Sequence, residues 1–221
     1  MSLLKKNIAN GITGIGIIIG IIACVLVIKQ PSWLWSEILL AGALITDALD
    51  GKAARKFGST KAGPYLDDIA DFINFGLHPS LWIWLITGSA PLAALYLCAI
   101  FYRLVRFTLK KQDTKNYFLG LPSPASAVWA LWVMMVHSEP SVLMISLGMI
   151  AFLSISHIPC IHVMKTTWIS RNIITLLVAS CLLPWVYGGD LFAFGLAQTV
   201  LVLSYILVSI TTLLIPHYVL R

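Results

Sequence analysis

Long apolar runs separated by short polar breaks determine what this chain can fold into. The first run, residues 7–28, carries no charge over 22 positions, which is long enough to cross a bilayer as a helix. Hydrophobic residues make up 59% of the 221 positions, whereas soluble domains contain about 45–50%. The pattern therefore predicts an all-α integral membrane protein.

The breaks between the runs divide the chain into about eight predicted transmembrane helices. Turn-forming residues mark four of the breaks: Pro31-Ser32, Gly88-Ser89-Ala90-Pro91, Ser138-Glu139-Pro140 and Gly188-Gly189-Asp190. The predicted spans cover about residues 7–28, 33–54, 65–87, 91–108, 121–137, 141–158, 172–187 and 191–215. Because every break is short, residues 1–221 are expected to form one membrane domain.

The basic residues lie almost entirely on one side of the predicted membrane. With the N-terminus in the cytosol, 14 of the 15 Lys and Arg residues are cytosolic, and Lys29 alone lies outside. By the positive-inside rule, this asymmetry predicts a multi-pass protein of the cytoplasmic membrane with a cytosolic N-terminus. The net charge of +6 therefore indicates membrane topology rather than binding of nucleic acid.

Four of the nine acidic residues form two helical pairs within 25 positions. Asp47 and Asp50 are three residues apart near the end of the second span, and Asp67 and Asp71 are four apart in the third. An unpaired charge in a bilayer costs about 3 kcal/mol or more, so such residues are functional candidates. Each pair lies on one helix face, and paired carboxylates suit hard divalent cations. The spacing predicts a two-metal site at the cytosolic membrane surface.

Carboxylate-held cations can clamp a diphosphate and stabilise charge on the attacking and leaving oxygens. A remaining carboxylate can take a proton from a hydroxyl nucleophile, and Arg55, two turns after Asp47, can meet a phosphate. The alternative is an ion-pair network with Lys52, Arg55 and Lys56, although five acids, Asp68 included, exceed what these bases need. The residues therefore indicate metal-assisted phosphoryl chemistry on an amphiphilic substrate.

These segments resemble the signature of the CDP-alcohol phosphotransferase family. Its eight fixed positions are matched by Asp47, Asp50, Gly51, Ala54, Arg55, Gly63, Asp67 and Asp71. The resemblance implies a six-helix core, at about residues 7–158, followed here by two extra helices at about 172–215. It also implies a CDP-linked lipid donor and two divalent cations, Mg²⁺ or Mn²⁺.

The resemblance further implies roles for single residues. The four aspartates (Asp47, Asp50, Asp67 and Asp71) are the implied metal ligands, and Asp71 is also the implied general base. Nucleotide contacts are implied for Asn10, Thr13, Gly51, Ala54, Arg55 and Gly63. Asp68 matches no fixed position of the signature, so we interpret it as a supporting or solvated residue.

Segments further along resemble the membrane-embedded phosphatidylserine synthases of this family. The similar segments are residues 71–79, 102–107 and 117–125. The resemblance implies transfer of the phosphatidyl group from CDP-diacylglycerol to the hydroxyl of L-serine, with CMP as the other product. Where those enzymes commonly have Ser-Phe-Gly after the last aspartate, this chain has Asn74-Phe75-Gly76, so an amide replaces a hydroxyl.

Candidates for binding the acceptor or the lipid phosphate are Arg103, Arg106 and Asn74. The two arginines are three positions apart on one helix face, and guanidinium pairs bidentately with phosphate and carboxylate. Ser123 and Ser126 are interpreted as residues that begin a helix. Alternative acceptors are glycerol 3-phosphate, inositol phosphate and choline. A non-enzymatic divalent-cation transporter is a remote alternative, because the other acids form no path across the membrane.

The expected partners are the substrates, membrane lipids and a second copy of the chain. A homodimer is implied by the family resemblance. The first span also contains Gly16-x-x-x-Gly20, a spacing that permits close helix contact within one protomer or between two.

Overall fold

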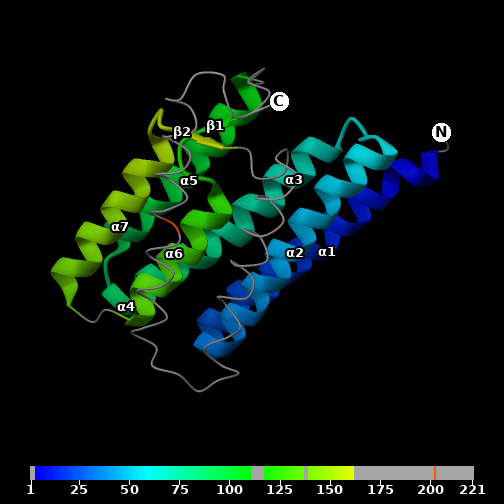
Figure 1. Ribbon diagram of the computed structural model, residues 1–221. Coiled ribbons are helices and arrows are strands. Elements are labelled where there is room, and N and C mark those ends of the chain that lie inside the picture. Colours follow the sequence, from blue (N-terminus) through cyan, green and yellow to red (C-terminus); the bar gives the residue numbers. More distant parts are fainter. Residues whose placement is uncertain (1–2, 111–116, 137–138, 162–201, 203–221) are drawn as a thin grey trace.

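The computed structural model describes residues 3–110, 117–136, 139–161 and 202 (Figure 1). Its helices are α1 (Leu3–Lys29), α2 (Trp33–Phe57), α3 (Gly63–Asp71), the π-helical segment η1 (Phe72–Leu77), α4 (His78–Thr87), α5 (Ala90–Lys110), α6 (Ser123–Val136) and α7 (Pro140–Ile155). Two three-residue strands, β1 (Tyr117–Leu119) and β2 (Pro159–Ile161), pair antiparallel. Helix α3, η1 and helix α4 follow one another without a loop.

The helices form a bundle in which consecutive long elements run antiparallel (Figure 1). Helix α1 packs along α2 and also contacts α3 and η1, while α5 packs against α7 and contacts α4 and η1. The N-terminal end of α1, the α2–α3 connection and the two strands all lie toward the upper part of the view (Figure 1). Most of the described basic residues lie near the start of α1 and in the later parts of α2 and α5, so they gather at this end of the bundle.

Three helices within the described residues are long and apolar enough to cross a membrane: Asn7–Lys29, Gly63–Thr87 and Ala90–Leu109. Helices α6 and α7 are apolar but shorter. Helix α2 has 25 residues, and its carboxylates Glu37, Asp47 and Asp50 lower its apolar character. Apolar side chains of α1 point away from the bundle, among them Ile15, Ile18, Ile22 and Val25. The predicted class, a helical membrane protein, is confirmed.

The fifth and sixth predicted spans differ from the helices that form. Helix α6 begins at residue 123 rather than 121, and α7 ends at 155 rather than 158. Gly120 has φ +84, a left-handed conformation that no helix continues, and the residues just before it form strand β1. The sequence did not predict this strand pair. The seventh and eighth predicted spans, about 172–187 and 191–215, lie outside the described residues.

Helix α6 lies at the centre of the bundle. Every residue from 125 to 134 is buried, including Trp129 and Trp132, each 1% exposed. A helix that is apolar all round must be enclosed by other elements, and α6 contacts α7, α4 and η1. Its first residue, Ser123, is therefore held deep inside the protein.

Buried polar contacts join α2 to α4 away from the aspartates. The Trp82 indole Nε1 donates to Ser36 Oγ over 2.6 Å, and His78 Nε2 lies 3.2 Å from the same oxygen. The Trp82 ring also stacks on Trp33 with centroids 3.9 Å apart. Because His78 and Ser36 are buried, these contacts fix how α4 sits on α2.

Candidate active site

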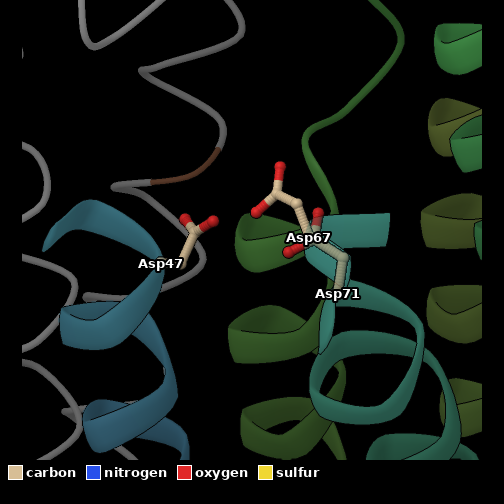
Figure 2. A group of neighbouring side chains, drawn as sticks. All are labelled: Asp47, Asp67 and Asp71. Carbon is tan, nitrogen blue, oxygen red and sulfur yellow. The ribbon is translucent and has the colours of Figure 1, made fainter. Parts of the chain in front are cut away.

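Three carboxylates from two helices converge at one place in the structure. Figure 2 shows Asp47, from α2, facing Asp67 and Asp71, from α3. Each residue offers a carboxylate oxygen, and these oxygens all lie within 4.8 Å of one another. One carboxylate of the first predicted pair, Asp47, therefore meets both carboxylates of the second between α2 and α3.

A cavity between α2 and α3 is lined by these three aspartates and also by the fourth, Asp50. It contains about 200 Å³ of empty space, part of which is open to solvent. Its lining residues are Thr13, Gly16, Ala43, Thr46, Asp47, Asp50, Asp67, Ala70, Asp71, Asn74 and Phe75. All four predicted metal ligands thus line one cavity, together with Thr13 and Asn74 from the predicted binding residues.

Thr13 supports the fourth aspartate from the first helix. Its hydroxyl donates to Asp50 Oδ2 over 2.8 Å, and the Ala9 carbonyl oxygen lies 3.0 Å from the same hydroxyl. Both Thr13 and Asp50 are buried. The structure therefore places Thr13 at the carboxylate site, while its predicted contact with a nucleotide stays a prediction.

The helix changes its winding immediately after Asp71. Residues 72–77 form the π-helical segment, and such wide turns are frequent at functional sites. Within it, Asn74 Nδ2 donates to the Gly16 carbonyl of α1 over 3.1 Å, and Tyr96 of α5 donates to the Phe75 carbonyl over 2.9 Å. These two contacts satisfy polar groups of the segment and hold the Asn74 amide at the cavity.

Gly16 and Gly20 of the first span make this close approach possible. A Cβ at Gly16 would lie 3.0 Å from Thr46 Oγ1. A Cβ at Gly20 would collide with Asn74 Oδ1 and lie 2.7 Å from Ile73 Cγ2. The Gly16-x-x-x-Gly20 spacing therefore serves packing of α1 against α2 and η1 within one chain.

We expect Gly20→Ala to disturb the site through Asn74. The added methyl must push Asn74 and Ile73 away, which overpacks a tight contact and costs about 1–3 kcal/mol. The variant should therefore lose both thermal stability in detergent and affinity for Mn²⁺. Gly14→Ala is the matched control, because a Cβ at Gly14 of the same helix meets nothing within 4 Å. Equal behaviour of the two variants would contradict the packing role.

Two predicted nucleotide-binding residues, Asn10 and Gly63, form hydrogen bonds with Thr60 of the α2–α3 connection. Asn10 Nδ2 donates to Thr60 Oγ1 over 2.9 Å, and the Gly63 backbone N–H donates to the same oxygen over 3.0 Å. A Cβ at Gly63 would lie 2.5 Å from Ser59 Oγ, so the glycine permits this turn to close. The structure thus gives Asn10 and Gly63 a local structural role beside the cavity, and their nucleotide contacts stay predictions.

The remaining signature residues lie beside the cavity and do not line it. A Cβ at Gly51 would lie 3.4 Å from Arg55 Nη1, so the arginine side chain folds back over its own helix. Arg55 is exposed, whereas Ala54 is partly buried. Their predicted contacts with a nucleotide stay predictions.

Arg103 reaches the aspartates through Ser123. Its Nη1 donates to Ser123 Oγ over 2.9 Å, and Ser123 Oγ donates to Asp71 Oδ2 over 3.2 Å. Arg103 is 7% exposed, and its charge acts on both Asp47 and Asp71. From sequence, Ser123 was interpreted only as a residue that begins a helix. Its contact with Asp71 could not be predicted, because 52 positions separate the two residues and no spacing rule connects them.

Arg106 lies one turn further along α5 than Arg103, and its side chain contacts backbone carbonyls near α6 and α7. Its guanidinium donates to three backbone carbonyls: those of Leu119 and Ile155 at 2.7 Å and that of Ser156 at 3.1 Å. The arginine therefore ties α5 to the segments that precede α6 and follow α7. The predicted contact of Arg106 with substrate gains no support from this arrangement.

The donor set fits hard divalent cations. The converging ligands are carboxylate oxygens, which Mg²⁺ and Mn²⁺ prefer over softer nitrogen or sulfur ligands. Asp67 is repelled by Asp50, Asp68 and Asp71, and Asp47 by Asp50 and Asp67. Bound divalent cations would offset this repulsion, so the residues present suit a metal-dependent reaction.

A helical membrane bundle with four carboxylates around one cavity defines a membrane-embedded protein with a candidate divalent-cation site. Comparison with known families identifies the group to which it is related. The chain belongs to the CDP-alcohol phosphatidyltransferase family, whose family model matches residues 6–218. Members of this family are transferases that use CDP-linked donors and divalent metals. The predicted family membership is confirmed.

Curated relatives differ in the acceptor that their names specify. CDP-diacylglycerol–serine O-phosphatidyltransferases from Mycobacterium leprae and Helicobacter pylori are 34% and 37% identical to this chain. Each match covers 41% of this chain, and 34% and 41% of the respective relative. A phosphatidylcholine synthase from Borreliella burgdorferi is 24% identical over 93% of this chain and 92% of its own length. The chain thus matches less than half of the length of the first two relatives.

Proposed function

We propose that this protein transfers the phosphatidyl group from CDP-diacylglycerol to the hydroxyl of L-serine. The products are phosphatidylserine and CMP. The observation that carries the proposal is the gathering of Asp47, Asp50, Asp67 and Asp71 around one cavity in a chain of this family. The serine synthases among its relatives support serine as the acceptor.

The residues of the site have complementary roles in this reaction. Divalent cations held by the aspartates would neutralise the donor's diphosphate and the departing CMP. Asp71 accepts the proton of the serine hydroxyl. The serine oxygen then bonds to the phosphorus that carries diacylglycerol, the bond from this phosphorus to the bridging oxygen breaks, and CMP leaves with the bridging oxygen.

Arg103 favours an acceptor that carries a carboxylate. Its guanidinium lies beside Asp71, linked through Ser123, and guanidinium binds carboxylates with directional hydrogen bonds. Choline instead carries a quaternary ammonium, which proteins commonly bind in aromatic cages. Among the residues that line the cavity in the described part of the chain, Phe75 is the one aromatic. We therefore prefer serine to choline.

Choline is the second candidate acceptor. The named phosphatidylcholine synthase matches nearly the whole chain, whereas each serine synthase reported above matches less than half of it. Asn74 stands where the serine synthases commonly have a hydroxyl residue, and it lines the cavity. These two observations keep choline as the competitor that an experiment must exclude.

We propose that the site faces the cytosol. The C-terminal end of α2, with Lys52, Arg55 and Lys56, lies at the same end of the bundle as the N-terminal end of α1. The positive-inside rule assigns that end to the cytosol, where serine and CMP are soluble. Homodimer formation stays a prediction from family resemblance.

The decisive experiment measures CMP release by the purified protein in detergent. CDP-diacylglycerol and Mn²⁺ or Mg²⁺ are supplied with one acceptor at a time: L-serine, choline, glycerol 3-phosphate or inositol phosphate. We expect release to depend on L-serine and to stop when the metal is chelated. Release dependent on choline would replace the serine assignment, and absence of release with every acceptor would overturn the proposed activity.

A further inference from the structure

Ser123 is a buried hydroxyl in direct contact with the proposed general base. It is 0% exposed and is the first residue of α6. Its Oγ lies 3.2 Å from Asp71 Oδ2 on α3 and 2.9 Å from Arg103 Nη1 on α5. The hydroxyl thus joins three elements at the aspartate site.

The chemistry of arginine sets the direction of these hydrogen bonds. A guanidinium has only donors, so Ser123 Oγ must accept from Arg103. A hydroxyl has one proton, and the neighbouring Asp71 Oδ2 is its acceptor. Ser123 therefore donates a hydrogen bond to Asp71 Oδ2, and the positive charge of Arg103 strengthens this hydrogen bond.

The start of α6 is held in place by contacts with α7 and the chain after it. The Gly120 backbone N–H donates to the Ile158 carbonyl over 2.8 Å, and the Leu121 N–H donates to the Leu153 carbonyl over 3.0 Å. Arg106 adds its hydrogen bond to the Leu119 carbonyl. The Ser123 hydroxyl consequently occupies a fixed position in the protein, independent of α3.

We propose that Ser123 is a positioning residue that fixes the Asp71 carboxylate by donating to Oδ2, so that the other oxygen is directed to the reaction. The inference rests on the proposed role of Asp71 and adds a residue that the family signature does not contain. Thr13 makes the matching contact with Asp50 Oδ2 from α1. Two of the four carboxylates are thus each oriented by a hydroxyl from a different helix, as outer hydrogen-bond partners orient metal-binding side chains.

The test compares Ser123→Ala with Ser126→Ala. Ser126 is also 0% exposed and lies one turn further along α6, but its hydroxyl bonds to the Pro122 carbonyl and to Ser154. We expect Ser123→Ala to raise the Kd for Mn²⁺ and lower kcat, each by about 10- to 100-fold, as loss of outer partners does at metal sites. Ser126→Ala should leave both quantities close to wild type.

Mn²⁺ binding is read from the electron paramagnetic resonance signal of free Mn²⁺, so it does not depend on turnover. In an Asp71→Asn background, Ser123→Ala should no longer change the Kd, because the hydroxyl acts through Asp71. If Ser123→Ala fails to fold, Ser123→Thr, which keeps a hydroxyl, should retain affinity and activity close to wild type.

Two outcomes would overturn the proposal: Ser123→Ala and Ser126→Ala changing the Kd and kcat equally, or Ser123→Ala lowering affinity just as much without Asp71. Failure of wild-type protein to release CMP with any acceptor would instead refute the proposed function. The Mn²⁺ measurements would still decide whether Ser123 orients Asp71.

Discussion

Asp71→Asn should abolish phosphatidyl transfer while leaving the protein folded. Asparagine has nearly the same shape, but its amide cannot take the proton of the acceptor hydroxyl. It also removes one negative charge from the carboxylates around the cavity. Loss of a general base costs about 10²- to 10⁴-fold, and weaker metal binding adds to this. We expect kcat, measured as acceptor-dependent CMP release in detergent, to fall by at least the upper part of that range.

Asp68→Asn provides the matched control for this substitution. Asp68 lies on the same helix three positions earlier, and its Oδ2 accepts a hydrogen bond from Thr108 of α5 over 2.6 Å. It is not among the residues that line the cavity. We expect this variant to retain most of its activity. If both variants lose activity to the same extent, the reaction does not depend on Asp71 in the way proposed.

Gly120→Ala should give the largest loss of stability among single substitutions at the described glycines. Its φ of +84 disfavours any side chain, which costs about 1–2 kcal/mol. In addition, a Cβ there would collide with the Ser154 carbonyl and lie 3.0 Å from both Arg106 Nη2 and the Ser156 carbonyl. Overpacking against backbone adds about 1–3 kcal/mol. Thermal unfolding in detergent should therefore move to a much lower temperature.

Gly88→Ala separates the two causes of that loss. Gly88 also has a left-handed φ, +63, but a Cβ there meets nothing within 4 Å. It should show the conformational cost alone, about 1–2 kcal/mol. A decrease in unfolding temperature as large for Gly88→Ala as for Gly120→Ala would mean that the contacts with Arg106 and the two carbonyls add nothing.

The grouping of the four aspartates could be predicted from sequence, because helical spacing determines which helix face each pair occupies. Asp47 and Asp50, like Asp67 and Asp71, are separated by about one turn, and the turn at residues 58–62 brings the two helices together. The membrane class followed from the length of the apolar runs and the high hydrophobic content. Both features depend on residues close in the chain. The membrane class is confirmed and the four aspartates line one cavity, while their role as metal ligands stays a prediction.

Other features depend on contacts between distant segments, which periodicity does not contain. The Ser123 hydroxyl contacts Asp71 and Arg103 only because the fold brings the start of α6 beside α3 and α5. Arg106 illustrates a different difficulty, because an arginine near a helix end has the same sequence appearance whether it binds a phosphate or backbone carbonyls. The β1–β2 pair joins residues 117–119 to 159–161, a distance along the chain that no local pattern bridges.

The π-helical segment η1 rotates the second half of one long helix, α4, relative to its first half, α3. A π turn contains an additional residue, so the helix after Leu77 is rotated by about 100° relative to a regular α-helix. The half with Asp67 and Asp71 can therefore be aligned for chemistry, while the half with Trp82 is aligned for packing on α2. Deleting a single residue within 72–77 would restore a regular helix yet force one half out of register. The two halves of this helix therefore share α1 as a neighbour but present different faces, one to the aspartate cavity and one to Trp33 and Ser36 of α2.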